Sequence, residues 1–370
     1  MAGSQKWSFG LTLHSNMNTR IPVFLSELAL ITSASAQLPR IVLQGSGDPQ
    51  VFTNVNAAIA AAQPDDRLYF SGGTFSDTNI VVTIPLHFIG AGISPDSSDV
   101  TSTTTIATPN NSNDYIAITT GASGSTFTGI RFNADNYFYF GLDEATDDPI
   151  DLVFERCVFD DRVYTVNGSS VGASSATFNE CIFHSLLNGQ TGVTATLSRC
   201  ILDYQAGTGA EVSGFDGGGL TLRHCIGLGT RVGNSSNCTI ENSIFTRTTA
   251  PFWQSNGAVL TNNLCVSDIL VSNMTPGAAV GNVLNVAATD IFISEDNTDF
   301  EWTDDLHLQP ACVGVGMATD GTDVGLYGSA APWKEGSAPF NPHFRAAAIA
   351  PATNANGDLP VNIRVAAQTH

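Results

Sequence analysis

One short pattern of apolar and polar positions recurs through the middle of the chain. Each copy has one apolar residue, two polar residues, one small residue and then two mostly apolar residues. The copies begin 24, 19, 25, 18 and 20 residues apart. A repeat of about 20 residues indicates a solenoid, whose successive turns stack and bury one continuous core. The six hexads are residues 154–159, 178–183, 197–202, 222–227, 240–245 and 260–265.

Two kinds of solenoid have repeats of this length, the leucine-rich repeat and the parallel β-helix. A leucine-rich repeat has leucines at fixed offsets, with an asparagine in an LxxLxLxxN frame. Here Phe, Ile, Val and Leu share the apolar positions, and no helix-forming run separates them. Short groups of strand formers between Gly, Ser, Thr, Asn and Asp are typical of strands joined by turns. The pattern therefore predicts an all-β chain folded as a parallel β-helix.

The hexad also predicts where each turn of the solenoid bends. Alternation holds through residues 176–178, fails at residues 179–181 and resumes at Ile182. A strand, a sharp corner and a second strand explain the break, because one continuous strand would keep a period of two. The fourth hexad position then lies at the corner, where equivalent positions stack about 4.8 Å apart. Its residues are Cys157, Cys181, Cys200, Cys225, Ser243 and Asn263.

The chain has seven cysteines, an odd number that excludes a fully intramolecular set of disulfides. Four of them occupy the corner position, where a small buried thiol packs as an apolar group. No group of cysteines and histidines has the spacing of a zinc site. We therefore expect the four corner cysteines to be buried, reduced and stacked, with Cys181→Ala costing on the order of 1 kcal/mol.

The hexads resemble the turns of the right-handed parallel β-helix of pectin-lyase-like proteins, and residues 240–245 (IENSIF) come close to their turn signature. The resemblance implies a right-handed solenoid, in which this corner often carries an asparagine ladder. Further segments are similar to uncharacterised secreted bacterial β-helix proteins, a group without an agreed activity. These segments are residues 72–75, 90–92, 320–328, 332–336, 340–343 and 359–368, and Ser329 replaces a glycine that is usual in such tails.

The two ends of the chain differ from the repeats. Residues 1–36 have the pattern of a signal peptide or N-terminal extension, because an apolar stretch precedes the cleavage motif Ala34-Ser35-Ala36. Met17 is an alternative start of translation. Residues 37–310 are expected to form the β-helix, and residues 311–370 a C-terminal capping tail.

A short helix is predicted at the start of the β-helix. Between residues 52 and 62, apolar residues recur at the i, i+3, i+4 spacing of one helix face. A solenoid needs a cap over its first open rung. We therefore expect a capping helix at residues 52–62.

The charge balance limits the partners. The chain has 34 acidic and 14 basic residues, and a net charge of −20. Such a chain is expected to repel nucleic acid, because binding to a phosphate backbone needs clustered Lys and Arg. No apolar run is long and clean enough to predict insertion into a membrane.

Titratable residues follow the hexads at equivalent positions. Asp160, His184 and Asp203 come directly after three successive hexads, and Asp161 and Arg247 occupy the next position. Rungs in register would bring the first three together, with the two carboxylates about 9–10 Å apart. Carboxylates around an imidazole suit acid–base catalysis on a glycan, in the wider geometry of an inverting hydrolase, or the binding of Ca²⁺. The alternative is a set of solvated turn residues, because Asp is common where strands end.

A second column of charges occupies the third hexad position. Signs alternate along part of it, which would relieve the stacking of like charges between rungs. As exposed pairs, these residues would contribute at most about 1 kcal/mol each. We expect a structural role for this column, which consists of Arg156, Glu180, Arg199 and His224.

Two functions from different classes remain open. The first is a secreted or cell-surface protein that binds or processes a polysaccharide, with Asp160, His184 and Asp203 as catalytic residues and Asp161 and Arg247 contacting the substrate. It needs no cofactor, although Ca²⁺ would fit. The second is a non-catalytic surface adhesin or a self-assembling fibre protein, which would form homo-oligomers. Of the sequence motifs that mark pectate lyases and polygalacturonases, this chain contains a counterpart of only one, the acidic pair, at residues 160–161.

Overall fold

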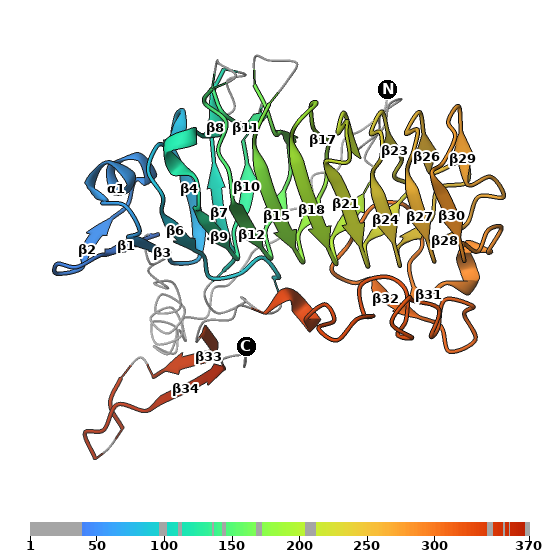
Figure 1. Ribbon diagram of the computed structural model, residues 1–370. Helices are drawn as coiled ribbons and strands as arrows, with labels where there is room; N and C mark the ends of the chain where they lie inside the picture. The colour runs from blue at the N-terminus through green and yellow to red at the C-terminus, as the bar shows by residue number, and fades with distance from the viewer. Residues whose placement is uncertain are drawn as a thin grey trace, which may run out of the picture. The chain divides into compact units, whose positions relative to one another are not determined.

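The chain coils into a right-handed parallel β-helix, in which each rung contributes one strand to each of three sheets (Figure 1). The expected signal peptide at residues 1–36 lies outside the described residues. The computed structural model describes residues 39–95, 102–109, 113–134, 137–142, 146–167, 172–203, 212–338, 343–350, 352–354 and 356–366.

The first sheet contains twelve strands over the described residues, and all of them except the two at its N-terminal end pair in parallel. In the order of the sheet they are β2 (Gln50–Phe52), β1 (Ile41–Gln44), β3 (Arg67–Phe70), β6 (His87–Ile89), β9 (Thr126–Thr128), β12 (Leu152–Glu155), β15 (Ser175–Asn179), β18 (Thr194–Ser198), β21 (Leu220–Arg223), β24 (Thr239–Glu241), β27 (Val259–Thr261) and β30 (Ala278–Val280).

The second sheet begins directly after the corner of each hexad, and its described strands are parallel throughout. They are β4 (Gly73–Ser76), β7 (Thr104–Ala107), β10 (Arg131–Asn133), β13 (Val158–Phe159), β16 (Ile182–Phe183), β19 (Ile201–Asp203), β22 (Ile226–Leu228), β25 (Ile244–Phe245) and β28 (Leu264–Cys265).

The third sheet completes each rung, again with parallel strands over the described residues. They are β5 (Ile80–Val82), β8 (Tyr115–Ile118), β11 (Tyr137–Phe140), β14 (Arg162–Tyr164), β17 (Leu187–Asn188), β20 (Val212–Ser213), β23 (Val232–Gly233), β26 (Phe252–Trp253) and β29 (Val271–Ser272).

The predicted capping helix is confirmed as α1 (Val55–Ala61). It begins after Asn54, whose side chain accepts a hydrogen bond from the backbone N–H of Ala57 at 2.8 Å and so satisfies one of the free donors of the first turn. Val55, Ala58 and Ile59 face the core. The antiparallel pair β1 and β2 adjoins the helix at this end of the solenoid (Figure 1).

The hexad folds as a strand, a corner and a second strand, as its broken alternation predicts. The bend is made by the third position, where the backbone enters the left-handed region. That conformation costs about 1–2 kcal/mol for a residue with a side chain, and asparagine tolerates it best. The φ angles are 50° at Arg156, 53° at Glu180, 51° at Arg199, 51° at His224, 55° at Asn242 and 49° at Asn262.

An earlier copy of the hexad, residues 127–132, does not stand out in the sequence because Gly129 and Ile130 occupy its third and fourth positions. Its register with the following rung is unambiguous: Phe127 lies beside Phe154, and Arg131 beside Val158. Gly129 has a φ of 67°, so it makes the same corner without the cost that a side chain adds.

The first hexad position builds the core. The rings of Phe88, Phe127, Phe154 and Phe178 stack on one another, with centroids 4.8 to 5.1 Å apart. These centroid separations match the spacing of parallel strands, so identical side chains in register pack face to face along the solenoid.

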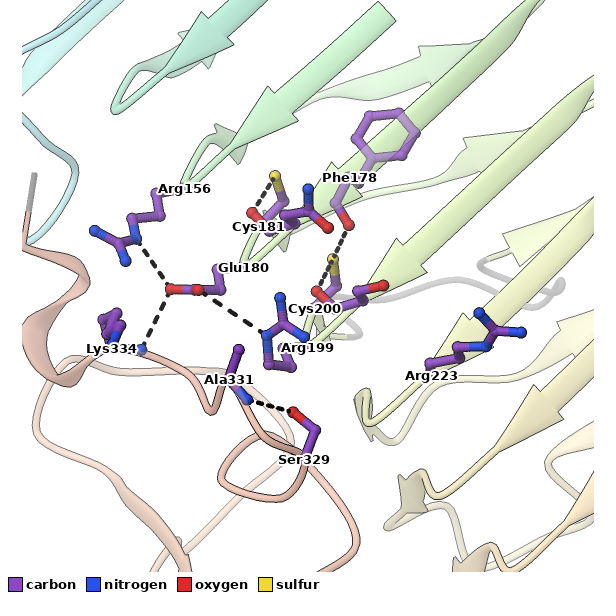
Figure 2. A network of polar contacts seen from close by, with 12 residues as sticks. Arg156, Phe178, Glu180, Cys181, Arg199, Cys200, Arg223, Ser329, Ala331 and Lys334 are labelled. Atoms are coloured by element: carbon purple, nitrogen blue, oxygen red, sulfur yellow. Dashed lines mark hydrogen bonds and ion pairs between the residues drawn. The ribbon is translucent and has the colours of Figure 1, made fainter. Parts of the chain in front are cut away.

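The corner cysteines form the expected buried ladder. All seven cysteines are free and buried, and burial raises the pKa of the Cys181 and Cys225 thiols. The Sγ atom of Cys200 lies 3.3 Å from the carbonyl oxygen of Phe178 in the preceding rung (Figure 2). The ladder then becomes polar, because Asn263 Oδ1 accepts the backbone N–H of Ser243 at 3.1 Å. Asn282 does the same for Asn263 at 3.0 Å.

After β30 the chain turns back and covers the outer face of the second sheet. We call residues 291–338 the strap. It contains β31 (Phe292–Ser294), β32 (Asp305–Leu308) and the short 3-10 helix η3 (Glu335–Ser337). Its apolar residues, among them Leu306 and Leu326, form one cluster with the outward side chains Ile182, Ile201, Ile226, Ile244 and Leu264 of the second sheet.

The remaining described elements lie outside the three sheets. They are the 3-10 helices η1 (Thr120–Ala122) and η2 (Ala288–Asp290) and the antiparallel pair β33 (His343–Ile349) and β34 (Val361–Ala366). Within the described residues, no helix has the length and apolar character needed to cross a membrane.

Candidate functional site

The predicted site residues lie where the chain leaves the second sheet. Phe159, Phe183 and Leu202 are in register on neighbouring strands, so Asp160, His184 and Asp203 follow at equivalent positions. The structure nevertheless separates them into two hydrogen-bonded groups, because their side chains turn toward different rungs.

His184 and Asp203 are brought together. His184 Nδ1 lies 2.5 Å from Asp203 Oδ2, and the backbone N–H of Phe300 in the strap donates to the same oxygen at 3.1 Å. Asp203 is buried, and its Oδ1 atom has no hydrogen-bond partner among the described residues. A carboxylate that holds one imidazole nitrogen orients the other as a general base.

Asp160 and Asp161 turn toward the preceding rung instead. Asp160 Oδ2 lies 2.7 Å from Arg131 Nε in an ion pair, and it also accepts from the side-chain amide of Asn133 at 3.3 Å. Asp161 accepts the backbone N–H of Ala134 at 3.1 Å. The network around Asp160 therefore does not include His184, which pairs with the following rung.

Arg247 anchors a turn between the second and third sheets. Its Nη1 atom donates to the carbonyl oxygen of Gly229 at 3.0 Å, and Nε donates to Thr249 Oγ1 at 2.8 Å. Two of its donors are thus engaged by the protein itself. Among the described residues, no group of three His, Cys, Asp or Glu side chains is placed to hold a metal ion.

In the third-position column Arg156, Glu180 and His224 are buried and Arg199 is half-buried, so the expectation of exposed charge pairs is wrong. Figure 2 shows Glu180 between Arg156 and Arg199 and against the backbone of Lys334. Glu180 Oε2 lies 2.9 Å from Arg156 Nε and accepts the N–H of Lys334 at 3.2 Å. The side chain of Arg156 is 1% exposed and also donates to the carbonyl oxygen of Ala338.

Burial of this column follows from the strap, which lies over the corner. The pKa of Arg156 is lowered by desolvation, which the neighbouring Glu180 carboxylate opposes. The pKa of His224 is also lowered, mainly by desolvation and against the attraction of Asp320. These charges hold the strap against the solenoid. The column therefore has the structural role expected of it, although its residues are buried or half-buried.

Sequence reasoning missed the outer face of the third sheet. We call one column on it the outer stripe. It runs through six consecutive rungs, in which each residue pairs in register with the next. Its residues are Tyr139, Tyr164, Asn188, Ser213, Gly233 and Trp253.

Aromatic side chains gather at both ends of the outer stripe. The rings of Tyr139 and Tyr164 lie 5.9 Å apart, and Tyr137 and Tyr115 extend this cluster with separations of 5.2 to 5.9 Å. All four rings are half-buried. Burial, together with the neighbouring tyrosines, raises the pKa of Tyr139 to about 12.

The middle of the outer stripe is polar, and its far end is aromatic. Asn188 Nδ2 donates to Ser213 Oγ at 3.3 Å, and the guanidinium of Arg231 lies 4.8 Å from the ring centre of Trp253. A signal for this surface exists in residues 137–140 (YFYF). Since Phe138 and Phe140 are buried, the alternating tyrosines must point outward, where a strand usually carries small polar residues.

Comparisons with known proteins assign no family to this chain. No family model, no curated protein and no solved structure matches it. The structure alone therefore establishes the parallel β-helix, and a function is inferred from the side chains on its surfaces.

Proposed function

We propose that this protein binds a polysaccharide along the outer stripe of the third sheet. The observation that carries the proposal is the register, which places Tyr139, Tyr164 and Trp253 in one column with Asn188 and Ser213 between them. Aromatic rings offer flat apolar faces to sugar rings, and amides and hydroxyls offer hydrogen bonds to their hydroxyl groups.

The dimensions of the outer stripe favour an extended ligand. Five strand spacings separate Tyr139 from Trp253, which is about 24 Å at the usual distance between strands. A chain of several sugar rings would contact both aromatic ends at once. The stripe is part of a sheet, so its side chains are held in place before the ligand arrives, which lowers the entropy cost of binding.

Catalysis on this ligand remains a prediction. His184 follows β16 and Asp203 is the last residue of β19, so both lie where the chain leaves the second sheet, and their hydrogen bond suits a general base. Asp160 is engaged with Arg131, so binding is the part of the proposal that the geometry supports best. If a bound glycan is cleaved, His184→Ala should lower kcat at least about tenfold, and a reducing-sugar assay tests this.

A glycan array probed with the full chain tests the proposal, followed by calorimetry on the best ligand. We expect Tyr164→Ala and Trp253→Ala each to raise Kd about tenfold, or ~1.4 kcal/mol. Thr196→Ala is the matched control, because Thr196 lies on the first sheet away from the outer stripe. The proposal fails if no glycan binds, or if these tyrosine and tryptophan variants bind as tightly as the control.

The location that suits this function is outside the cell, in the secreted or surface-bound state that the resemblance to pectin-lyase-like proteins implies. The support is the apolar stretch at residues 21–31 followed by Ala34-Ser35-Ala36. We expect secreted material to begin at Gln37. N-terminal sequencing that finds residues 17–36 intact would contradict export by cleavage.

A second candidate function, end-to-end assembly, is favoured by the last rung. β30 is the final strand of the first sheet among the described residues, and Val280 on it is 62% exposed. An unpaired edge strand is a template for another chain, whereas α1 occupies the opposite end. Analytical ultracentrifugation should detect self-association that Val280→Lys abolishes. A monomer at all concentrations would exclude this candidate.

A further inference from the structure

A cavity of about 200 Å³ lies between the strap and the second sheet. Four aromatic residues line it: Phe300, Trp302, Tyr327 and Trp333. Ile201 of the second sheet contributes to the wall, and the backbone of Phe300 is fixed by its hydrogen bond to Asp203. The strap and the solenoid therefore build this cavity together, on a different sheet from the outer stripe.

The rings are positioned by contacts that do not involve a ligand. The rings of Phe300 and Trp302 meet edge to face at 5.2 Å. Tyr327 stacks on His307 with 3.6 Å between ring centres, and His307 Nε2 lies 3.3 Å from Glu335 Oε1. An aromatic site that is already formed loses little entropy when it binds.

The charged part of the cavity lining is acidic. Asp304 and Glu335 line the cavity, and among the described residues no Lys or Arg does so. The strap segment at residues 295–305 contains six acidic residues, and the chain has no Lys or Arg between residues 248 and 333. Lys334 follows Trp333 but is not part of the lining.

The acidic groups around the cavity lie close together, and burial and mutual repulsion disfavour their charged forms. Asp304 Oδ2 accepts the backbone N–H of Glu301 at 2.8 Å, yet its pKa is raised, first by burial and further by Glu301 and Asp296. The pKa of Glu295 is raised for the same reasons, with Asp304 as one of its neighbours. A positive charge in the cavity would relieve both the desolvation and the repulsion.

We propose that this cavity binds an organic cation through an ammonium group. Aromatic faces are electron-rich and attract ammonium ions, most strongly where water is excluded. The half-buried carboxylate of Asp304 and the largely exposed carboxylate of Glu335 add negative charge, which disfavours an anionic ligand. A cavity of about 150 Å³ accommodates benzene, so this one fits a quaternary ammonium head group or a single amino-sugar ring.

This site goes beyond the proposed binding of a polysaccharide, because it uses other residues and another sheet. Two sources could supply the ammonium group, a free quaternary amine or an amino sugar. Both share the chemistry that the cavity recognises, and the experiment separates them.

Calorimetric titration of the full chain with choline, and with its neutral isostere in which carbon replaces nitrogen, tests the charge requirement. We expect choline to bind at least about tenfold more tightly than the isostere. A second pair, glucosamine and N-acetylglucosamine, tests the amino sugar in the same way. Binding of either cation in preference to its neutral partner supports the site and identifies the source. Equal affinity for charged and neutral partners, or no binding of any of the four, overturns the proposal.

Variants locate the binding to this cavity. Trp302→Ala and Asp304→Asn should each weaken binding of the preferred cation about tenfold or more. Asp299→Asn is the matched control, since it removes one negative charge from the same segment but Asp299 does not line the cavity. Thermal melting confirms that each variant is folded. If Asp299→Asn weakens binding as much as Asp304→Asn, the effect is one of overall charge and the site is wrong.

Discussion

The second and third sheets are built from the same rungs, yet their outer faces differ. On the second sheet the outward side chains Ile182, Ile226 and Ile244 are fully buried beneath the strap. On the third sheet the outward side chains Tyr139 and Tyr164 are half-buried and pack against other tyrosines. The difference shows that a rung dictates which residues face outward, whereas another part of the chain decides whether that face meets water.

The strap also distinguishes two kinds of charge pair, one that it covers and one that it leaves exposed. Arg156 and Glu180 are buried at the corner under the strap, whereas Arg223 and Glu241 pair at 2.7 Å on the first sheet with Arg223 half exposed. A buried charge that loses its partner remains desolvated without any compensating attraction, whereas a surface charge that loses its partner is solvated by water. Position under the strap therefore decides how much each pair contributes.

The largest effect is expected from Glu180→Gln. It keeps the volume of the side chain but leaves the Arg156 guanidinium without its carboxylate, so the free energy of unfolding should fall by about 3–5 kcal/mol. Glu241→Gln is the matched control, with an expected loss below about 1 kcal/mol. Urea denaturation of both variants measures this, and similar losses would show that the strap does not bury the Glu180 pair.

The next largest effect is expected from Ile226→Ala. Ile226 is fully buried between the second sheet and the strap, so truncation should cost about 2–5 kcal/mol through lost burial and the cavity left behind. The same denaturation experiment checks it. A loss of a few tenths of a kcal/mol would mean that this face is open to water, as the outer stripe is.

A smaller effect, dependent on pH, is expected from His224. Its folded-state pKa lies below the unfolded value of about 6.5, so the unfolded chain binds more protons between these two values. Stability should therefore fall as pH drops below about 6.5, by at most about 1.4 kcal/mol per pH unit for this one group.

His224→Asn should remove that part of the pH dependence. Asn242 and Asn262 occupy the same left-handed position in the next two rungs, so the backbone accepts asparagine there. Urea denaturation between pH 5 and pH 8, compared between variant and parent, measures the difference. Identical pH profiles would show that His224 titrates as freely in the folded chain as in the unfolded one.

The smallest effect on stability is expected from Tyr164→Ala on the outer stripe. It removes a half-buried ring and its contact with Tyr139, which should cost about 1 kcal/mol, in contrast to the cost at Ile226. Thermal melting checks this, and it also establishes that a loss of glycan binding in this variant is not a loss of fold. A cost as large as that of Ile226→Ala would place the outer stripe in the core.

Much of the fold could be predicted from the sequence because the hexad carries local information. Its alternation specifies two strands, and its break specifies the corner, which the left-handed backbone at Glu180 confirms. The small residues of the fourth position predict the buried cysteine ladder. Each of these features depends on the residue and its nearest neighbours, which repeat from rung to rung.

The candidate site could be predicted only in part. The register places Asp160, His184 and Asp203 at equivalent positions. Their side chains nevertheless pair in opposite directions along the solenoid, since Asp160 pairs with Arg131 of the preceding rung and His184 with Asp203 of the following rung. A repeat fixes which backbone positions lie side by side. It does not fix the rotamer of a side chain that has an ion-pair partner available on either side.

The sequence by itself determined the solenoid, its corner and its end cap, since these follow from periodicity and from conformational preferences of single residues. Only the tertiary structure decided that the strap covers the second sheet, buries Glu180 and encloses the aromatic cavity. The contact between Glu180 and Lys334 joins residues 154 positions apart. No local pattern encodes such a contact, because it arises only when two separately formed surfaces are complementary.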